Sequence, residues 1–242
     1  MIFVKPLIKL FIIMLYNNRS QIRRVISRDR LDGYFREIKH RQGSCNLLDA
    51  LTYYSWNALL SESFYVSLQT LEVSLRNSIQ TAANKHFGNP LWFEDQSILK
   101  DSEIKNINSA KKNLKRQRKN IDSGRIVSEL HFGFWTSLFY ARYETILWRP
   151  LIKPVFPKLD RQRWNRKKLS GRFDKIRKFR NRIFHYEPVW YYNLQEIHSE
   201  IIESIFWIEP SMLELLKLID PFPKCCSQER FDEFKISFKK IF

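Results

Sequence analysis

The chain has 242 residues, of which 44% are hydrophobic and 15% aromatic, so its composition is that of a globular protein and excludes the intrinsically disordered class. It carries 42 basic against 25 acidic residues, and a formal net charge of +17 favours a polyanionic partner such as nucleic acid or an anionic membrane surface. Three cysteines, two of them adjacent, form neither a disulfide framework nor a set with metal-ligand spacing. The sequence therefore indicates a reducing compartment and no zinc site.

The first residues, MIFVKPLIKLFIIMLYNNRS, are apolar but interrupted by a proline and two lysines. The longest uninterrupted run, from Leu10 to Tyr16, is far shorter than the ~20 residues that a membrane span needs. We expect residues 1–20 to be an N-terminal extension without stable membrane insertion. Two alternatives stay open: a true start at Met14 instead of Met1, and peripheral attachment of residues 1–16 to an anionic membrane.

The remainder, residues 21–242, is predicted to form one all-α domain, because no stretch alternates as a strand would and glycines are few. Helices are expected over residues 21–41, 47–86, 102–121, 125–148, 160–186, 193–218 and 228–241, with a proline-rich loop at 150–157. One face of the second helix repeats apolar residues at spacings of three and four, namely Leu68, Leu71, Leu75, Ile79 and Ala82.

The segment HFGFWTSLFY has the aromatic content of a base-stacking platform, but its spacing favours core packing. Phe132, Trp135, Leu138 and Phe139 are expected to be buried, with Gly133 allowing another helix to come close. The sequence thus predicts a structural role for this segment.

The basic helix ends in KFRNRIFHYEP, residues 178–188. At 100° per residue its apolar side chains share one side, and these are Phe173, Ile176, Phe179 and Ile183. Arg177, Asn181 and His185 are spaced i, i+4, i+8 and are neighbours on another side. Arg180 lies about 140° around an ideal helix from His185. The two can meet only if Arg180 reaches around, if the last turn distorts, or if a second copy of the chain supplies one of them.

These residue types are suited to one reaction, the cleavage of RNA by its own 2′-OH. An imidazole accepts and returns protons near neutral pH, and a guanidinium offers fixed donors to phosphate oxygens as charge builds on them. An amide such as Asn181 orients either group. The expected product ends in a 2′,3′-cyclic phosphate, and no metal or other cofactor is required.

The Arg-x4-His spacing has little specificity alone, and a similar pair, Arg125 and His131, occurs in RIVSELH. The competing interpretation of His185 is a histidine at a helix C-terminus, which the helix dipole favours. Spacing alone leaves both interpretations open.

Longer blocks resemble a known family. Arg180, Asn181 and His185 in RNRIFH match the Arg-Asn-x3-His form of the HEPN superfamily of helical RNases. YYSWNALLSESFYVSLQTLEVSLRNSI, IVSELHFGFWTSLF, LWRPLIKPVFP and IRKFRNRIFHYEPVW together resemble the Abi-like family, named for abortive infection. These blocks occur in that family's order over roughly residues 24–220.

The resemblance implies a HEPN-like helical bundle with additional helices, a homodimer with a composite site, and metal-independent cleavage of RNA in phage defence or growth arrest. Carried over by position, Arg180, Asn181 and His185 are the catalytic set, and the Arg125–His131 match is discounted. A neutralising antitoxin and a cytoplasmic location are expected with this role. The alternative is a catalytically inactive RNA-binding or protein-interaction module on the same fold.

Other polar residues are expected to support this site. Glu72, Arg76 and Asn77 in LEVSLRN, together with Arg177, are candidates for orienting Arg180 or His185, whereas the structural interpretation of Glu72 and Arg76 is an ion pair within one helix. The RNA backbone is expected along the basic helix, on Lys167, Lys168, Arg172, Lys175, Lys178 and Arg182. A second basic run, KKNLKRQRK at residues 111–119, is either another such track or a solvated face.

Overall fold

A computed structural model describes residues 19–160, 162 and 165–241. Throughout these ranges the regular elements are helices and none is a strand, so the all-α prediction is confirmed. No helix within them is long and apolar enough to cross a membrane. Residues 1–18 lie outside the description, and with them most of the expected extension and both candidate start residues.

The described chain folds into two compact units. Unit 1 contains the described parts of Met1–Phe64, Arg182–Leu194 and Pro221–Phe242, and unit 2 contains Tyr65–Asn181 and Gln195–Asp220. The helices of unit 1 are α2 (Arg19–Ile26), α3 (Arg28–Gln42), α4 (Leu47–Ser63), α13 (Phe222–Cys225) and α14 (Gln228–Ile241). Helix α10 (Arg166–Phe184) contributes to both units, because the division falls between Asn181 and Arg182.

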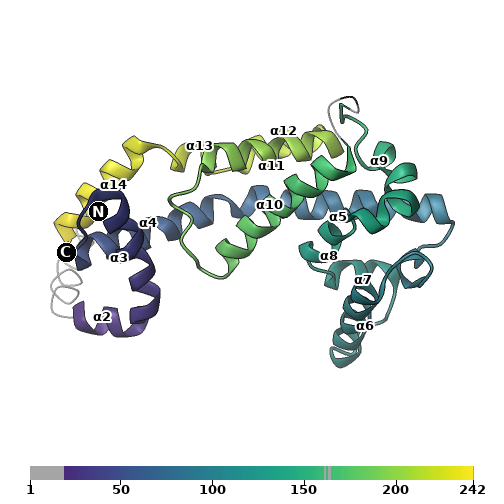
Figure 1. The fold of residues 1–242 in the computed structure, drawn as a ribbon, viewed down its shortest axis with the longest axis horizontal. Coiled ribbons are helices and arrows are strands. Elements are labelled where there is room, and N and C mark those ends of the chain that lie inside the picture. The colour runs from purple at the N-terminus through teal and green to yellow at the C-terminus, as the bar shows by residue number, and fades with distance from the viewer. Residues whose placement is uncertain (1–18, 161, 163–164, 242) are drawn as a thin grey trace, which may run out of the picture. The chain divides into compact units, whose positions relative to one another are not determined.

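Unit 2 is built around one long helix, α5 (Tyr65–Phe87). Its other elements are η1 (Trp92–Glu94), α6 (Asp101–Arg116), α7 (Ser123–Glu129), α8 (Phe132–Ser137), η2 (Ala141–Tyr143), the π-helical turn η3 (Glu144–Trp148), α9 (Arg149–Val155), α11 (Leu194–Ile208) and α12 (Ser211–Ile219). In this unit α6 and α7 lie side by side (Figure 1).

The core of unit 1 forms where α3 crosses α4. Tyr34 and Ile38 of α3 and Tyr53 of α4 are buried there, and the ring of Trp190 lies 4.4 Å from that of Tyr53, centroid to centroid. Asn46 starts α4 with a capping box, accepting a hydrogen bond from the backbone N–H of Asp49 while the Asp49 carboxylate accepts one in return. The segment that carries His185 is therefore tied to this core through Trp190.

The core of unit 2 confirms the predicted apolar faces. All five apolar residues named on α5 are buried, and so are Phe132, Trp135, Leu138 and Phe139. The inward side of the basic helix is buried as well, with Phe173 stacked at 4.7 Å on Phe139, which in turn stacks at 4.1 Å on Trp148. Aromatic burial of this extent fixes how α10 lies within unit 2.

Three predicted helices are each interrupted, so their predicted continuity was wrong. The 21–41 helix breaks at Ser27, whose φ of 75° is outside the helical region, and the 47–86 helix breaks at Phe64 between α4 and α5. The 193–218 helix breaks before Pro210, which cannot extend the preceding helix. Such breaks are not visible in the apolar periodicity, which continues on both sides of them.

The predictions of one helix over residues 125–148 and of a proline-rich loop at 150–157 were also wrong. The former divides into α7, α8 and short 3-10 and π turns, while Pro150 and Pro154 lie inside helix α9. Pro150 stands in the first turn, where its missing N–H costs nothing. The basic helix is shorter than predicted, Arg166–Phe184, whereas α14 has the predicted bounds.

Unit 2 also contains a buried carboxylate, that of Glu103 in α6. It accepts hydrogen bonds from Tyr143 at 2.5 Å, Ser137 at 3.0 Å and Ser102 at 2.8 Å, and pairs with Arg142 at 2.6 Å. Burial would raise the pKa of Glu103, but these hydrogen bonds and the Arg142 charge outweigh it and hold the pKa below its ordinary value. Burial and the bond to Glu103 raise the pKa of Tyr143 to about 12. The network fastens α6 to the segment around Tyr143.

Candidate functional site

Helix α10 ends at the candidate histidine in a defined motif. The N–H of Tyr186 donates to the carbonyl of Ile183 at 3.0 Å, and the N–H of Glu187 donates to that of Arg182 at 2.8 Å. Tyr186 has a φ of 58°, so the two bonds and the left-handed residue form a Schellman motif with His185 at the C-cap. Glycine is usual at the left-handed position, and tyrosine there carries backbone strain next to His185.

Two side chains of unit 1 hold the backbone of this turn. Arg30 of α3 donates from Nη1 to the carbonyl of Tyr186 at 2.6 Å and approaches that of His185 at 3.5 Å. Asn57 of α4 donates to the carbonyl of Glu187 at 3.2 Å and accepts from the N–H groups of Val189 at 2.6 Å and Trp190 at 3.2 Å. The His185 side chain itself is exposed. The turn thus leaves the imidazole exposed to solvent, on a backbone that side chains of both α3 and α4 hold in place.

Sequence reasoning did not single out Arg30 or Asn57. Asn57 is 3% exposed in an otherwise apolar stretch, YYSWNALL. A buried amide must have hydrogen-bond partners, so an asparagine within an apolar helical run was the available signal. Arg30 gave no comparable signal, because it lies in a segment rich in arginine.

In unit 2 the candidate arginine is paired with a candidate supporting residue. The Nη2 atom of Arg180 lies 3.5 Å from Oε2 of Glu72, and both side chains are mostly buried. Among the described residues no ion pair joins Glu72 to Arg76, whose Nε is buried without a hydrogen-bond partner. Asn77 is exposed. The contact agrees with an orienting role for Glu72 toward Arg180.

The catalytic set is divided between the units. Arg180 and Asn181 belong to unit 2, whereas His185 belongs to unit 1. Arg177, also in unit 2, donates to Asp174 at 2.5 Å, and its Cδ would lie 3.9 Å from a Cβ built on Gly133 of α8. The nearest atoms to that Cβ belong to His131, so the prediction that Gly133 lets another helix come close stays a prediction. The shared role of Arg180, Asn181 and His185 stays a prediction.

Most cations expected to bind RNA along α10 are paired with carboxylates. Arg172 bonds Glu203, and Lys175 bonds Glu196 at 2.5 Å and Glu200 at 3.1 Å. Lys178 pairs with Asp174 at 2.8 Å, and Arg182 lies 3.4 Å from Glu187 and donates to the Tyr191 hydroxyl at 2.9 Å. Lys167 and Lys168 are exposed.

The pKa values of these pairs follow from the contacts. Burial would lower the pKa of Lys175, but hydrogen bonds to Glu196 and Glu200 raise it above its ordinary value. Burial would raise the pKa of Asp174, but the bonds from Lys178 and Arg177 lower it. Much of the positive charge of α10 is therefore compensated by neighbouring carboxylates.

The discounted pair of Arg125 and His131 has structural roles. Arg125 pairs with Asp122 at 2.7 Å, and His131 is the N-cap of α8, accepting from the N–H of Phe134 at 3.2 Å through Nδ1. A Cβ on Gly133 would lie only 3.1 Å from that nitrogen. Within the described ranges, no three or more His, Cys, Asp or Glu side chains form a group that could hold a metal ion.

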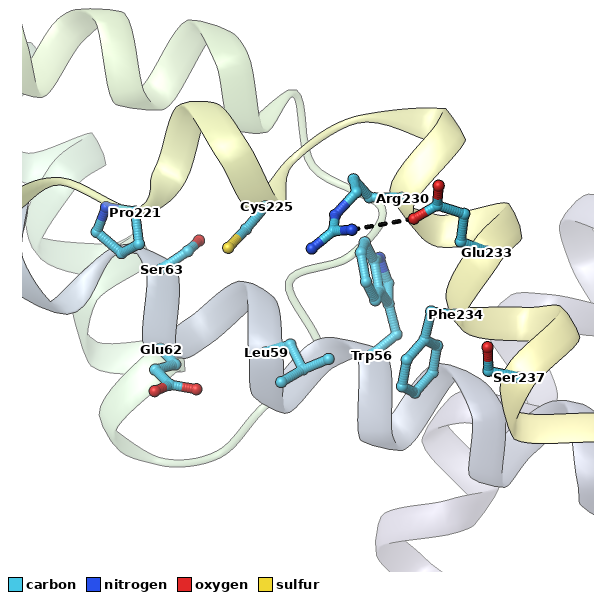
Figure 2. Close-up of a pocket in the computed structure, with 10 residues that line it drawn as sticks. All are labelled: Trp56, Leu59, Glu62, Ser63, Pro221, Cys225, Arg230, Glu233, Phe234 and Ser237. Atoms are coloured by element: carbon cyan, nitrogen blue, oxygen red, sulfur yellow. Dashed lines mark hydrogen bonds and ion pairs between the residues drawn. The ribbon is translucent and has the colours of Figure 1, made fainter. Parts of the chain in front are cut away.

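A cavity of about 420 Å³ lies in unit 1, between α4, α13 and α14. Figure 2 shows Trp56, Leu59 and Phe234 along it, with Arg230 paired to Glu233 at 3.0 Å. None of the residues predicted from the sequence lines it. The cavity is therefore distinct from the turn that carries His185.

Comparison with known proteins adds no assignment. No family model matches the chain. No curated protein matches it, and no solved structure does.

Proposed function

We propose that this chain is a metal-independent endoribonuclease that acts in abortive infection or growth arrest, with the HEPN-type bundle, homodimer and cytoplasmic location that the sequence resemblance implies. The observation that carries the proposal is the end of α10. An exposed histidine caps a helix there, beside a strained residue, on a backbone fixed by Arg30 and Asn57. Backbone strain and fixed backbone geometry are common where a side chain must be held ready for chemistry.

The proposed reaction needs only the groups of the chain and of RNA. His185 removes the proton from the 2′-OH, and that oxygen attacks the adjacent phosphorus. The P–O5′ bond breaks, the 5′ oxygen takes a proton, and the products are a 2′,3′-cyclic phosphate and a 5′-OH. Arg180, held by Glu72, stabilises charge on the non-bridging oxygens, and Asn181 orients the pair.

In the proposed homodimer, Arg180 of one copy acts with His185 of the other. Cleavage of a quenched fluorescent RNA by wild type, Arg180→Ala and His185→Ala tests the residues, and mixing the two variants tests the arrangement. A heterodimer with sites composed across the interface regains one intact site. The mixture should then recover about a quarter of wild-type activity after subunit exchange. Two inactive variants that stay inactive when mixed would refute the shared site.

One observation favours the second candidate, an inactive module of the same type. The Arg180 guanidinium contacts Glu72, and an arginine held by a carboxylate is less available to phosphate. If the chain is an inactive module, wild type, Arg180→Ala and His185→Ala should all bind RNA with the same affinity, and none of them should produce fragments. A neutralising antitoxin is expected only if the chain is a nuclease.

A further inference from the structure

The second basic run lies at the C-terminal end of α6, in unit 2. Lys112, Lys115, Arg116 and Lys119 follow i, i+3, i+4, i+7 spacing and are all exposed, while Leu114 between them is buried. No acidic residue occurs between Ile104 and Ile121. We name Lys112, Lys115, Arg116, Arg118 and Lys119 the α6 tip. Lys112, Lys115 and Arg116 lie on the exposed side of α6, and Arg118 and Lys119 follow in the turn that ends it.

The backbone of the α6 tip is strained in the same way as the end of α10. The N–H of Lys119 donates to the carbonyl of Leu114 at 3.0 Å, and that of Arg118 donates to the carbonyl of Lys115 at 3.0 Å. Arg118 has a φ of 55°, so this is a Schellman motif with arginine where glycine is usual. An arginine at that position disfavours the fold locally and adds one more cation to the patch.

In the part of the chain that the structure describes, the cations of the α6 tip lack the carboxylate partners that most cations of α10 have. Lys111, next to the tip, pairs with Glu94 at 2.7 Å, but within the described residues no carboxylate forms an ion pair with Lys112, Lys115, Arg116, Arg118 or Lys119. On α10, by contrast, Arg172, Lys175, Lys178 and Arg182 each have a carboxylate partner. An incoming phosphate must displace a carboxylate at these four positions of α10 and need displace none on the α6 tip.

We propose that the α6 tip, rather than the α10 track, is the main anchor for the phosphate backbone of single-stranded RNA. The choice of RNA rests on the proposed function, whereas the location rests on the uncompensated charge. A lipid surface fits less well, because an interfacial helix needs an apolar face and the apolar side of α6, with Ile107 and Leu114, is buried in unit 2. Contacts of this kind raise affinity without selecting sequence.

The test compares two variants of the full chain that lose equal charge. The tip variant carries Lys112→Gln, Lys115→Gln, Arg116→Gln and Lys119→Gln. The control carries Arg172→Gln, Lys175→Gln, Lys178→Gln and Arg182→Gln, the four cations of α10 that pair with carboxylates. Fluorescence anisotropy with a labelled 2′-O-methyl RNA, which has no 2′-OH to react, measures binding alone across a salt series, and circular dichroism confirms that both variants are folded.

We expect the tip variant to bind on the order of 10-fold or more weakly and to reduce the slope of log K against log salt by about 0.7 for each phosphate that it no longer neutralises. The control should change both far less. A control that is weakened as much as the tip variant, a tip variant that binds like wild type, or a wild type that binds anionic vesicles and not RNA would overturn the inference. Wild type that binds through the tip but never cleaves RNA would support the anchor while refuting the nuclease.

Discussion

Replacing Asn57 by alanine removes the side chain that fastens the turn after His185. Its amide makes three hydrogen bonds to the backbone of Glu187, Val189 and Trp190. Val189 is completely buried, so its N–H would be left without an acceptor and without water. An orphaned buried group costs about 1–3 kcal/mol and the removal of a hydrogen bond about 1 kcal/mol, so we expect a decrease of about 3 kcal/mol in the free energy of unfolding.

For a chain of this size that decrease corresponds to a fall in melting temperature of about 6–12 °C. The matched control is Thr52→Val, also on α4, which removes one buried hydrogen bond to the carbonyl of Leu48 at 2.8 Å and orphans no N–H group. Its cost should be about 1 kcal/mol. Thermal and urea unfolding followed by circular dichroism measure both variants.

The same variants test whether the turn positions His185. RNA cleavage is measured well below the melting temperature of both proteins, so that each is folded. Asn57→Ala should lose cleavage while Thr52→Val retains it. An Asn57→Ala protein as stable as Thr52→Val would refute the structural reasoning, and one that cleaves normally would show that the turn needs no such anchor.

Four further predictions concern unit 2. Glu103→Gln should destabilise the protein by about 2 kcal/mol near neutral pH. Because the pKa of Glu103 is lowered by folding, that contribution is present above its ordinary value of 4.5 and disappears as the pH falls through the folded pKa, so wild type and variant should converge in acid unfolding. Because folding raises the pKa of Tyr143, the free energy of unfolding of wild type should decrease as the pH rises from 10 toward about 12. Tyr143→Phe should not show this decrease. Arg118→Gly should raise the melting temperature, since relief of left-handed strain is worth about 1 kcal/mol, and should weaken RNA binding; a lower melting temperature would contradict the assigned strain. Glu72→Gln should reduce cleavage about 5-fold at unchanged RNA affinity, the equivalent of about 1 kcal/mol for a partly buried pair with Arg180, and unchanged cleavage would remove Glu72 from the site.

The predictable part of the fold was the set of apolar faces. Leu68, Leu75, Phe173 and Ile183 are buried because spacing at three and four residues allows only one side of a helix to face the core. The breaks were not predictable in the same way. Ser27 and Phe64 interrupt helices without proline or glycine. Ser27 is the N-cap of α3 and accepts a hydrogen bond from the backbone N–H of Arg30, whereas the ring of Phe64 packs at 4.7 Å on that of Phe222, which is distant in sequence.

The candidate site, like the fold, could be predicted from the sequence only in part. The end of the basic helix near His185 could be predicted, because Pro188 and the helix periodicity both mark it. The compensation of the Lys175 charge by Glu196 and Glu200 could not be predicted, because those carboxylates lie on another helix, 21 and 25 residues away. Net charge predicts that a polyanion is attracted, but only tertiary pairing decides which cations remain to bind it.

The measurement that tests the central claim most directly is the chemistry of the cut. Purified wild type and His185→Ala are incubated with total RNA in excess EDTA, and the 3′ ends of the fragments are identified. The account predicts fragments from wild type alone, each ending in a 2′,3′-cyclic phosphate. Equal fragments from both proteins, fragments ending in 3′-OH, or intact RNA with both would contradict it.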